Sequence, residues 1–380
     1  YAGPALKGMF NKYTAEQIEN EARNSPNFYA YEKSGIRQNE LEGYNPAFRE
    51  EMVNSALADK IPIFRDVVSA SNRYGTLLGN MIRRGLLDDF IAKNPNLTNA
   101  ELQGYGNALN VFTGIGDLGD FSAAAEWLSL GFFAPKLAIS RFQTPWMMAK
   151  YWELPRVRKQ IARDLVGFVA TGSAILGLAE IGGKALGVTV GNIFDPRDPD
   201  WMKVKIGNQH FDPFGGFIQP ARLIARLGIR ATDRMGFTGK DLLASEKDID
   251  PLDLIGQFAA FKVAPWISLT SELMTGKTAV GEPATIPGTL LRSVTTLMLQ
   301  DIYDAWDIER NPAAVTRAAL ASGSGIGAQT YRDSETRTRK KMRDLLDKKD
   351  FTGAAKLQSD WNLRTPKKRI VEQKNTRELM

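Results

Sequence analysis

Residues 165–190, LVGFVATGSAILGLAEIGGKALGVTV, form the most apolar and glycine-rich stretch of the chain. Fifteen consecutive uncharged residues lie between Asp164 and Glu180. As an α-helix rising about 1.5 Å per residue, they would cover roughly 22 Å, which is shorter than the ~30 Å hydrocarbon core of a bilayer. A helix committed to crossing a membrane is therefore not expected. We expect either a helix buried in a helical assembly, or one that is buried in one state and enters a bilayer in another.

Small residues recur at a spacing of four along this stretch, a pattern that allows two helix backbones to approach closely. Each interior glycine costs about 1 kcal/mol relative to alanine in a helix, so the segment should depend on close neighbours for its stability. We therefore predict that it packs against another helix or contacts a membrane. The residues predicted to make this contact are Gly167, Ala170, Thr171, Ser173, Ala174, Leu176, Gly177 and Leu178.

The composition restricts the chemistry that the chain can perform. It contains no cysteine, which excludes disulfides, thiol nucleophiles and cysteine-ligated zinc. The only histidine is His210, so a histidine-based catalytic or metal site would have to be built from one imidazole. No paired carboxylates, Ser-Lys arrangement or phosphate-binding GxxxxGK[ST] loop stands out. We therefore predict a protein that is not an enzyme and has no catalytic residues, metal or cofactor.

The positive charge is concentrated at the C-terminal end. The whole chain has a formal net charge of +6, and from Tyr331 onward fifteen Lys and Arg stand against eight Asp and Glu. Such a segment can neutralise nucleic-acid phosphates, an attraction that depends on salt and ignores base sequence. It is equally compatible with a solvated pair of helices, because its acidic residues are interspersed. The residues predicted to contact phosphate are Arg337, Arg339, Lys340, Lys341, Lys367, Lys368 and Arg369.

Apolar residues at helical spacing predict a mostly α-helical protein, an irregular assembly of many helices. One predicted helix covers residues 63–93, and another starts at Thr98, which is in capping-box spacing with Glu101. Further helices are predicted at residues 14–23, 46–60, 137–152, 251–261 and 266–274. Alternation in residues 202–211 around Gly207 predicts one small type II′ β-hairpin. At 380 residues, the chain should have several sub-domains. We predict an extended aromatic arm at 1–45, a helical domain at 46–190 ending in the apolar helix, a hairpin with helices at 191–330, and a basic helical tail at 331–380.

Two glycine-rich segments have further predicted roles. Residues 114–119, GIGDLG, match the dinucleotide-binding pattern GxGxxG, which requires a preceding strand and an acidic residue about 20 positions later. Here the preceding residues have helical spacing, and no Asp or Glu occurs between Glu126 and Glu153. We therefore predict a tight corner between helices, with nucleotide binding as the alternative. Glycines within residues 323–327 predict a flexible joint before the basic end.

Short motifs between residues 94 and 331 resemble the shared C-terminal region of large phage polyvalent and internal virion proteins. In those proteins, an N-x-x-T-G-x-G-x-L-G segment is followed by F-F-(S/A)-P-(R/K) and S-R. The corresponding segments here begin at Asn110, Phe132 and Ser140. Ile115 departs from the pattern, because many relatives have a basic residue there, and this puts an anion contact at that corner in doubt. Further matches in the same order are KVKIGN at 203–208, GGF at 215–217, KVAPW at 262–266, GEP at 281–283 and GIGAQTY at 325–331.

The resemblance implies that the chain has a structural role in a phage particle and does not catalyse a reaction. Such regions belong to long proteins that are packaged inside tailed-phage heads and delivered into the host with the genome, while enzymatic modules lie elsewhere in those chains. The implied function is a structural component of the internal core or genome-ejection apparatus, contributing to a trans-envelope channel. The implied locations are the virion interior and, after ejection, the host cell envelope. The chain begins at Tyr1, which agrees with a piece of a longer protein.

The implied partners follow from this role. They are copies of the same chain in a ring near the portal, other internal virion or portal proteins, phage DNA, and the host inner membrane during ejection. The alternatives are a DNA-organising virion protein acting through the basic tail, or a nucleotide-binding enzyme domain that uses residues 114–119.

Overall fold

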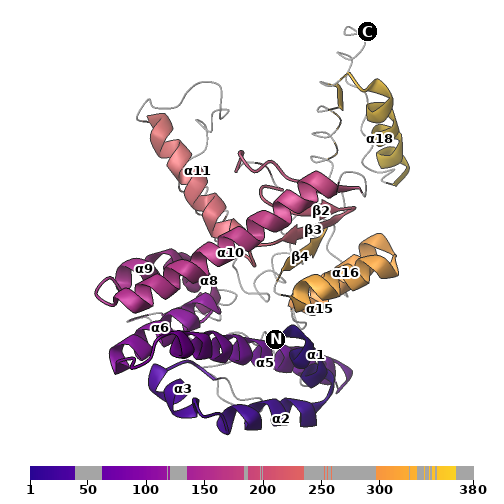
Figure 1. The fold of residues 1–380 in the computed structure, drawn as a ribbon. Helices are drawn as coiled ribbons and strands as arrows, with labels where there is room; N and C mark the ends of the chain where they lie inside the picture. The colour runs from indigo at the N-terminus through magenta and orange to yellow at the C-terminus, as the bar shows by residue number, and fades with distance from the viewer. Residues whose placement is uncertain are drawn as a thin grey trace.

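The computed structural model of the chain describes residues 1–38, 62–117, 119, 135–183, 187–196, 198, 200–234, 252, 255, 258, 297–324, 326–331, 338, 342, 345, 346 and 349–364. The protein is mostly α-helical, as predicted, and also has a small antiparallel sheet. Figure 1 shows α10 crossing the molecule between a group of helices and this sheet. The helices are α1 (Ala2–Phe10), α2 (Lys12–Arg23), α3 (Phe28–Ser34), α5 (Pro62–Lys93), α6 (Asn99–Phe112), α8 (Pro135–Gln143), the 3-10 helix η3 (Thr144–Trp146), α9 (Met147–Lys150), α10 (Pro155–Gly182), α11 (Ile218–Arg234), α15 (Leu297–Glu309), α16 (Pro312–Gly323) and α18 (Phe351–Arg364). The strands are β1 (Val188–Val190), β2 (Val204–Ile206), β3 (Gln209–Asp212) and β4 (Gly327–Thr330).

The helical lobe comprises α1–α3, α5, α6, α8, η3, α9 and the first half of α10. Its core lies where α3, α5, α6 and α10 meet, and Leu87, Phe90, Tyr105 and Ile161 are fully buried there. The ring centroids of Phe90 and Tyr105 are 4.4 Å apart. Burial of these large side chains from α5, α6 and α10 contributes apolar stabilisation to this lobe.

Two helices of this lobe agree with the sequence prediction. The helix predicted at residues 63–93 is α5. Helix α6 begins with the predicted capping box: the Thr98 hydroxyl accepts the backbone N–H of Glu101, and the Glu101 carboxylate accepts that of Thr98. This bond from the Thr98 N–H lowers the pKa of Glu101, because it favours the charged carboxylate.

The N-terminal residues form three packed helices, so the predicted extended arm is wrong for its described part. Helix α1 packs against α2 and α5, and α3 packs against α6. Ala5 and Leu77 are fully buried between α1 and α5. The cap of α2 is Asn11, whose side chain accepts the N–H of Thr14 at 3.3 Å, and the helix therefore starts before the predicted position. Tyr31, an aromatic residue within the predicted arm, is buried in the core.

The sheet lobe comprises β1–β4, the second half of α10, the start of α11, and α15 and α16. Its four strands are antiparallel in the order β1-β2-β3-β4. The predicted hairpin is β2–β3, and its turn has Gly207 at φ 61°, a conformation that favours glycine. The single predicted hairpin is thus the middle of a larger sheet. Leu176, Val204, Phe211 and Ala328 belong to its core.

Two predicted boundaries are wrong at this sheet. Strand β1 pairs with β2, so a domain boundary after residue 190 would separate two paired strands. The predicted flexible joint at residues 323–327 instead ends α16 and starts β4, where Gly327 is the register partner of Asp212. Both errors arise because strands of three or four residues have almost no periodicity of their own.

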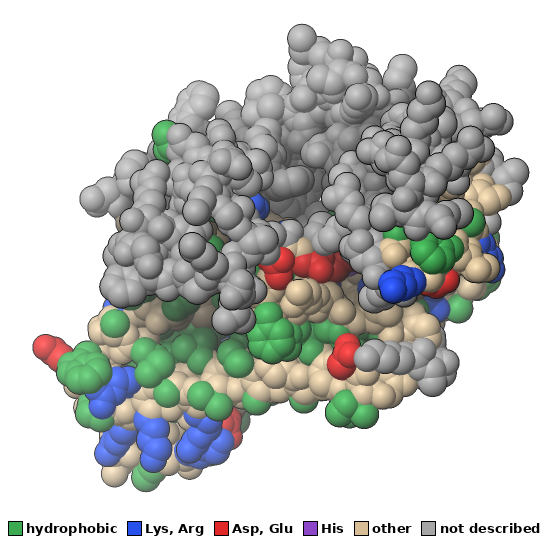
Figure 2. Space-filling model, turned by 90° about the horizontal axis from the view of Figure 1, so that it is seen from above, with side chains coloured by type: hydrophobic (Ala, Val, Ile, Leu, Met, Phe, Trp, Pro, Cys, Tyr) green, Lys and Arg blue, Asp and Glu red, His purple; other side chains and the backbone are tan. Residues whose placement is uncertain are grey.

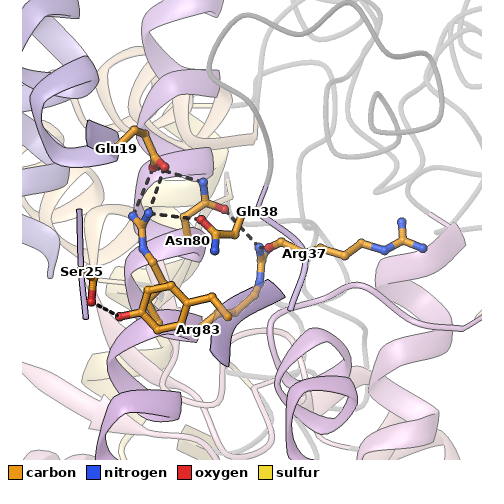
Figure 3. A network of polar contacts seen from close by, with 8 residues as sticks. Glu19, Ser25, Arg37, Gln38, Asn80 and Arg83 are labelled. Atoms are coloured by element: carbon orange, nitrogen blue, oxygen red, sulfur yellow. Dashed lines mark hydrogen bonds and ion pairs between the residues drawn. The ribbon is translucent and has the colours of Figure 1, made fainter. Parts of the chain in front are cut away.

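A buried polar network connects α2, α5 and the segment after α3 (Figure 3). The carboxylate of Glu19 accepts hydrogen bonds from Arg84 at 2.9 and 3.2 Å and from Asn80 at 3.2 Å. Arg83, the residue before Arg84 on α5, donates from Nε to the hydroxyl of Thr113 at 2.8 Å and from Nη1 to the carbonyl of Arg37. Glu19 and Arg84 thus form an ion pair and Arg83 donates to neutral oxygen atoms, so the network holds these segments together.

Of the other predicted helices, some lie outside the described residues and one is interrupted. The helices predicted at 46–60 and 266–274 lie outside the described residues, as does most of the one predicted at 251–261. The helix predicted at 137–152 is divided into α8, η3 and α9, and the 3-10 segment coincides with Pro145.

Candidate assembly surface

Helix α10 is anchored to the helical lobe through its first half. It contacts α6 and α9, and Val157 and Ile161 are fully buried. Asp164 accepts hydrogen bonds from the hydroxyl of Tyr105 at 2.8 Å and from Gln160 at 2.9 Å. Burial raises the pKa of Tyr105, and also that of Asp164. This half of the helix is therefore fixed by both packing and hydrogen bonds.

The second half of α10 packs one face on the sheet lobe. Gly172 approaches the ring of Phe214 so closely that a side chain at this position would displace the ring. Phe168 packs edge-on against Phe214 and Phe217, with ring centroids 5.9 and 5.2 Å away. Leu176 is buried in the core of the sheet lobe. The helix therefore connects the two lobes through a single continuous run of residues.

The opposite face of this half is exposed, although its residues carry no charge up to Ala179. Val166 is 68% exposed, Leu178 is 73% exposed and Ile181 is 87% exposed. A Cβ added at Gly167 or Gly177 would meet nothing within 4 Å, so the space above both glycines is open. We call this surface the outer face of α10; it consists of Val166, Gly167, Val169, Ala170, Thr171, Ser173, Ala174, Gly177, Leu178 and Ile181.

Most of the predicted packing residues are on this outer face. Their side chains are therefore not covered by other parts of the same chain. Only Leu176 is buried, Gly177 is half-buried, and the other six predicted residues are exposed. Helix α10 is long and apolar enough to cross a membrane, and 11% of its most apolar window is buried. The uncharged part is still the fifteen residues counted in the sequence. The structure therefore places an apolar helix at the surface, where a second molecule can reach it.

The glycine segment at 114–119 was predicted to form a tight corner between helices, with a nucleotide-binding loop as the alternative. In the structure, Gly116 lies at a close contact between α6 and α8. The segment follows α6, so no strand precedes it. A Cβ at Gly116 would lie 2.6 Å from the carbonyl oxygen of Lys136 and 2.7 Å from the backbone nitrogen of Ser140. Gln143 of α8 bonds to both backbone groups of Asp117, at 2.9 and 2.7 Å. Gly116 thus allows α8 to pack directly on the end of α6.

The contact that joins α8 to the sheet lobe was not predicted from the sequence. Arg141 donates to the carbonyl of Gly215 at 3.1 Å, and its guanidinium lies 4.2 Å from the ring centroid of Phe217. Asp212 shapes the same loop by accepting the N–H groups of Phe214 and Gly216 at 2.8 and 2.9 Å. Burial lowers the pKa of Arg141 to about 10 and raises that of Asp212. The only sequence signal for this contact was the resemblance, whose motifs include S-R, which contains Arg141, and G-G-F, which begins at Gly215.

His210 lies inside the sheet lobe. It is almost fully buried, its Nδ1 is 2.8 Å from a carboxylate oxygen of Asp200, and its ring centroid is 5.4 Å from that of Tyr331. Among the residues that the structure describes, no group of three or more His, Asp or Glu side chains is arranged to hold a metal ion. His210 therefore has a structural position in the sheet.

The seven predicted phosphate-contact residues, from Arg337 to Arg369, lie outside the described residues. Comparison with models of protein families, with curated proteins and with solved structures finds no match to this chain.

Proposed function

We propose that this chain is a structural component of a tailed-phage internal core or genome-ejection apparatus, in which copies pack against one another through the outer face of α10. The observation that carries the proposal is the exposure of this helix along its run of fifteen uncharged residues. In this proposal the chain is packaged in the virion, delivered with the DNA, and performs no reaction.

The energetics favour a partner on the outer face. Burying a Val, Leu or Ile side chain contributes about 1.5–3 kcal/mol, and four such residues are more than half exposed here: Val166, Val169, Leu178 and Ile181. Open space above Gly167 and Gly177 allows another backbone to approach closely. A second α10 has the same small residues, so two copies of the helix complement each other.

The charges on α10 restrict how two copies pair. Lys159 and Arg163 extend the outer face toward the start of the helix, so fully aligned parallel copies would bring like charges together. Ala174 lies fifteen residues beyond Lys159, which is about 22 Å along the helix axis. A crossing centred on Ala174 keeps the charges apart, and we expect the contact there.

The placement of the resembling motifs supports the family role. Gly116 of the first motif packs on Ser140 of the S-R motif, and Arg141 reaches the G-G-F motif at Gly215. The backbone N–H of Tyr331 in the GIGAQTY motif donates to the carbonyl of Asn208 in the KVKIGN motif at 3.1 Å. Segments that resemble the phage proteins individually are thus in contact with one another, as a shared folding unit requires.

The direct test is a charge on the outer face. Ala174→Glu places a carboxylate in the proposed contact but leaves the exposed side chain free in a monomer. We expect the wild-type chain to sediment as an oligomer and Ala174→Glu to sediment as a monomer with unchanged circular dichroism. The control is Ala355→Glu, an exposed alanine on α18. A wild-type chain that stays monomeric at all concentrations, or its absence from particles of a phage that encodes it, would refute the proposal.

A further inference from the structure

The end of the molecule where α9 meets α10 combines exposed tryptophans with basic residues. Trp146 of η3 and Trp152 of the turn before α10 are each 70% exposed. Residues 146–163 contain five Lys and Arg but a single acidic residue, Glu153. Figure 2 shows blue and green side chains gathered at this end of the molecule. We call this surface the basic tip; it consists of Trp146, Lys150, Trp152, Arg158, Lys159 and Arg163.

Most of the basic tip is exposed to solvent. Lys150, Lys159 and Arg163 are exposed, and the helix beneath them is held by the buried residues Val157 and Ile161. The next carboxylate along α10, Asp164, is turned inward by its hydrogen bonds to the helical lobe. The tip therefore presents net positive charge together with two large amphipathic rings on a fixed support.

This combination matches the chemistry of an anionic bilayer surface. Tryptophan side chains concentrate at the membrane–water interface, where the ring contacts the acyl boundary and the N–H stays hydrated. Lysine and arginine are attracted to anionic headgroups, and each improves partitioning by about fivefold. Helix α10 continues from the tip into the uncharged Val166 and Val169, so apolar contact adjoins the charged contact.

A single-stranded nucleic acid fits the tip less well. Bases stack on open aromatic faces, but the guanidinium of Arg158 lies 4.2 Å from the ring centroid of Trp152 and covers one of its faces. The adjoining outer face of α10 has no basic residue after Arg163 until beyond the helix end, so phosphates would find no continuing track there.

We infer that the basic tip docks the chain on an anionic phospholipid surface. The inference rests on the proposed function, because delivery into a host brings the chain to a membrane. A neighbouring copy that crosses at Ala174 leaves the tip accessible, since Ala174 lies eleven residues beyond Arg163, about 16 Å along the helix axis.

Flotation of the full chain with vesicles tests this inference. We expect it to float with phosphatidylcholine vesicles that contain phosphatidylglycerol, to remain unbound with pure phosphatidylcholine, and to be released by high salt. Lys150→Gln with Lys159→Gln should weaken binding by about 25-fold, from the fivefold contribution of each residue. The double variant Trp146→Ala with Trp152→Ala should abolish flotation. The matched control is Lys7→Gln with Phe10→Ala, an exposed pair on α1, which should float as the wild type does.

The inference is overturned if the wild type does not float with anionic vesicles or if the tip variants float unchanged. It is also overturned if single-stranded DNA binds the tip and anionic vesicles do not. The outcomes separate the two proposals: a chain that floats but stays monomeric refutes the proposed assembly alone, whereas an oligomer that fails to float refutes only the lipid contact.

Discussion

The ion pair of Glu19 and Arg84 shows how single residues hold the helical lobe together. Their side chains are 15% and 7% exposed, and Glu19 is the carboxylate that faces the Arg84 guanidinium. Glu19→Gln leaves this guanidinium buried without its counter-charge, so we expect the free energy of unfolding to fall by about 3 kcal/mol. Urea denaturation measures the loss.

A nearby pair on the same helix provides the control. Glu16 lies 4.0 Å from Lys12, and both side chains are about half exposed. Because solvent screens such a pair, Glu16→Gln should cost less than about 0.5 kcal/mol. Equal effects of the two substitutions would show that the buried network does not stabilise α2 on α5.

Asp301 gives a pH-dependent prediction. Burial raises its pKa well above the usual value, and the neighbouring charge of Asp304 raises it further. The stability that protonated Asp301 contributes is therefore present below the ordinary aspartate pKa and is lost as the pH rises through the raised value. Asp301→Asn keeps an uncharged group beside the Ser322 hydroxyl, 3.3 Å from the present carboxylate. We expect this variant to be more stable than the wild type at neutral pH.

Denaturation at several pH values tests the sign. The advantage of Asp301→Asn should shrink as the pH falls toward the ordinary aspartate pKa of about 4, and it should be smallest below that pH, where the wild-type carboxyl is protonated in both the folded and the unfolded state. Asp307→Asn is the control, because Asp307 is paired with Arg310 at 2.9 Å on the surface side of the same helix, and its substitution should bring no gain. A gain for Asp301→Asn that persists in acid would contradict the explanation.

Among the elements, α10 should be the least uniformly protected helix. Its second half is covered on one side only, whereas α6 is buried along most of its length. Local opening is easier where few apolar contacts are lost, so amides of residues 166–179 should exchange with solvent faster than those of α6 in dilute protein. Hydrogen exchange measures this, and the difference should shrink once copies assemble. Equal protection in the monomer would contradict the account.

Elements with strong local signals were predictable from the sequence, and those that depend on distant partners were not. The capping box of Thr98 and the alternation around Gly207 are local, and both elements are present. Strand β4 becomes a strand through pairing with β3, more than a hundred residues earlier. Sequence alone also did not predict which side of α10 is exposed, because a spacing of small residues is the same on a covered and an uncovered helix.

At the scale of the molecule, most of the described residues belong to two lobes that are joined by α10 and by a few specific contacts. Arg141 reaches the loop of Gly215, and the hydroxyl of Tyr74 in α5 donates to the carbonyl of Gly323 at the end of α16. Helix α10, which connects the lobes, thus has one side packed on its own chain and an outer face exposed to solvent. In the proposed function, the open side is where the next copy packs.

A disulfide cross-link tests this central claim most directly, because the chain has no cysteine of its own. A single Ala174→Cys can form a disulfide only if the same residue of another copy comes within about 7 Å between Cα atoms. Upon mild oxidation of the assembled protein, we predict a disulfide-linked dimer for Ala174→Cys and no more than background for Ala355→Cys. If Ala174→Cys cross-links no better than this control, the packing of copies through the outer face of α10 is contradicted.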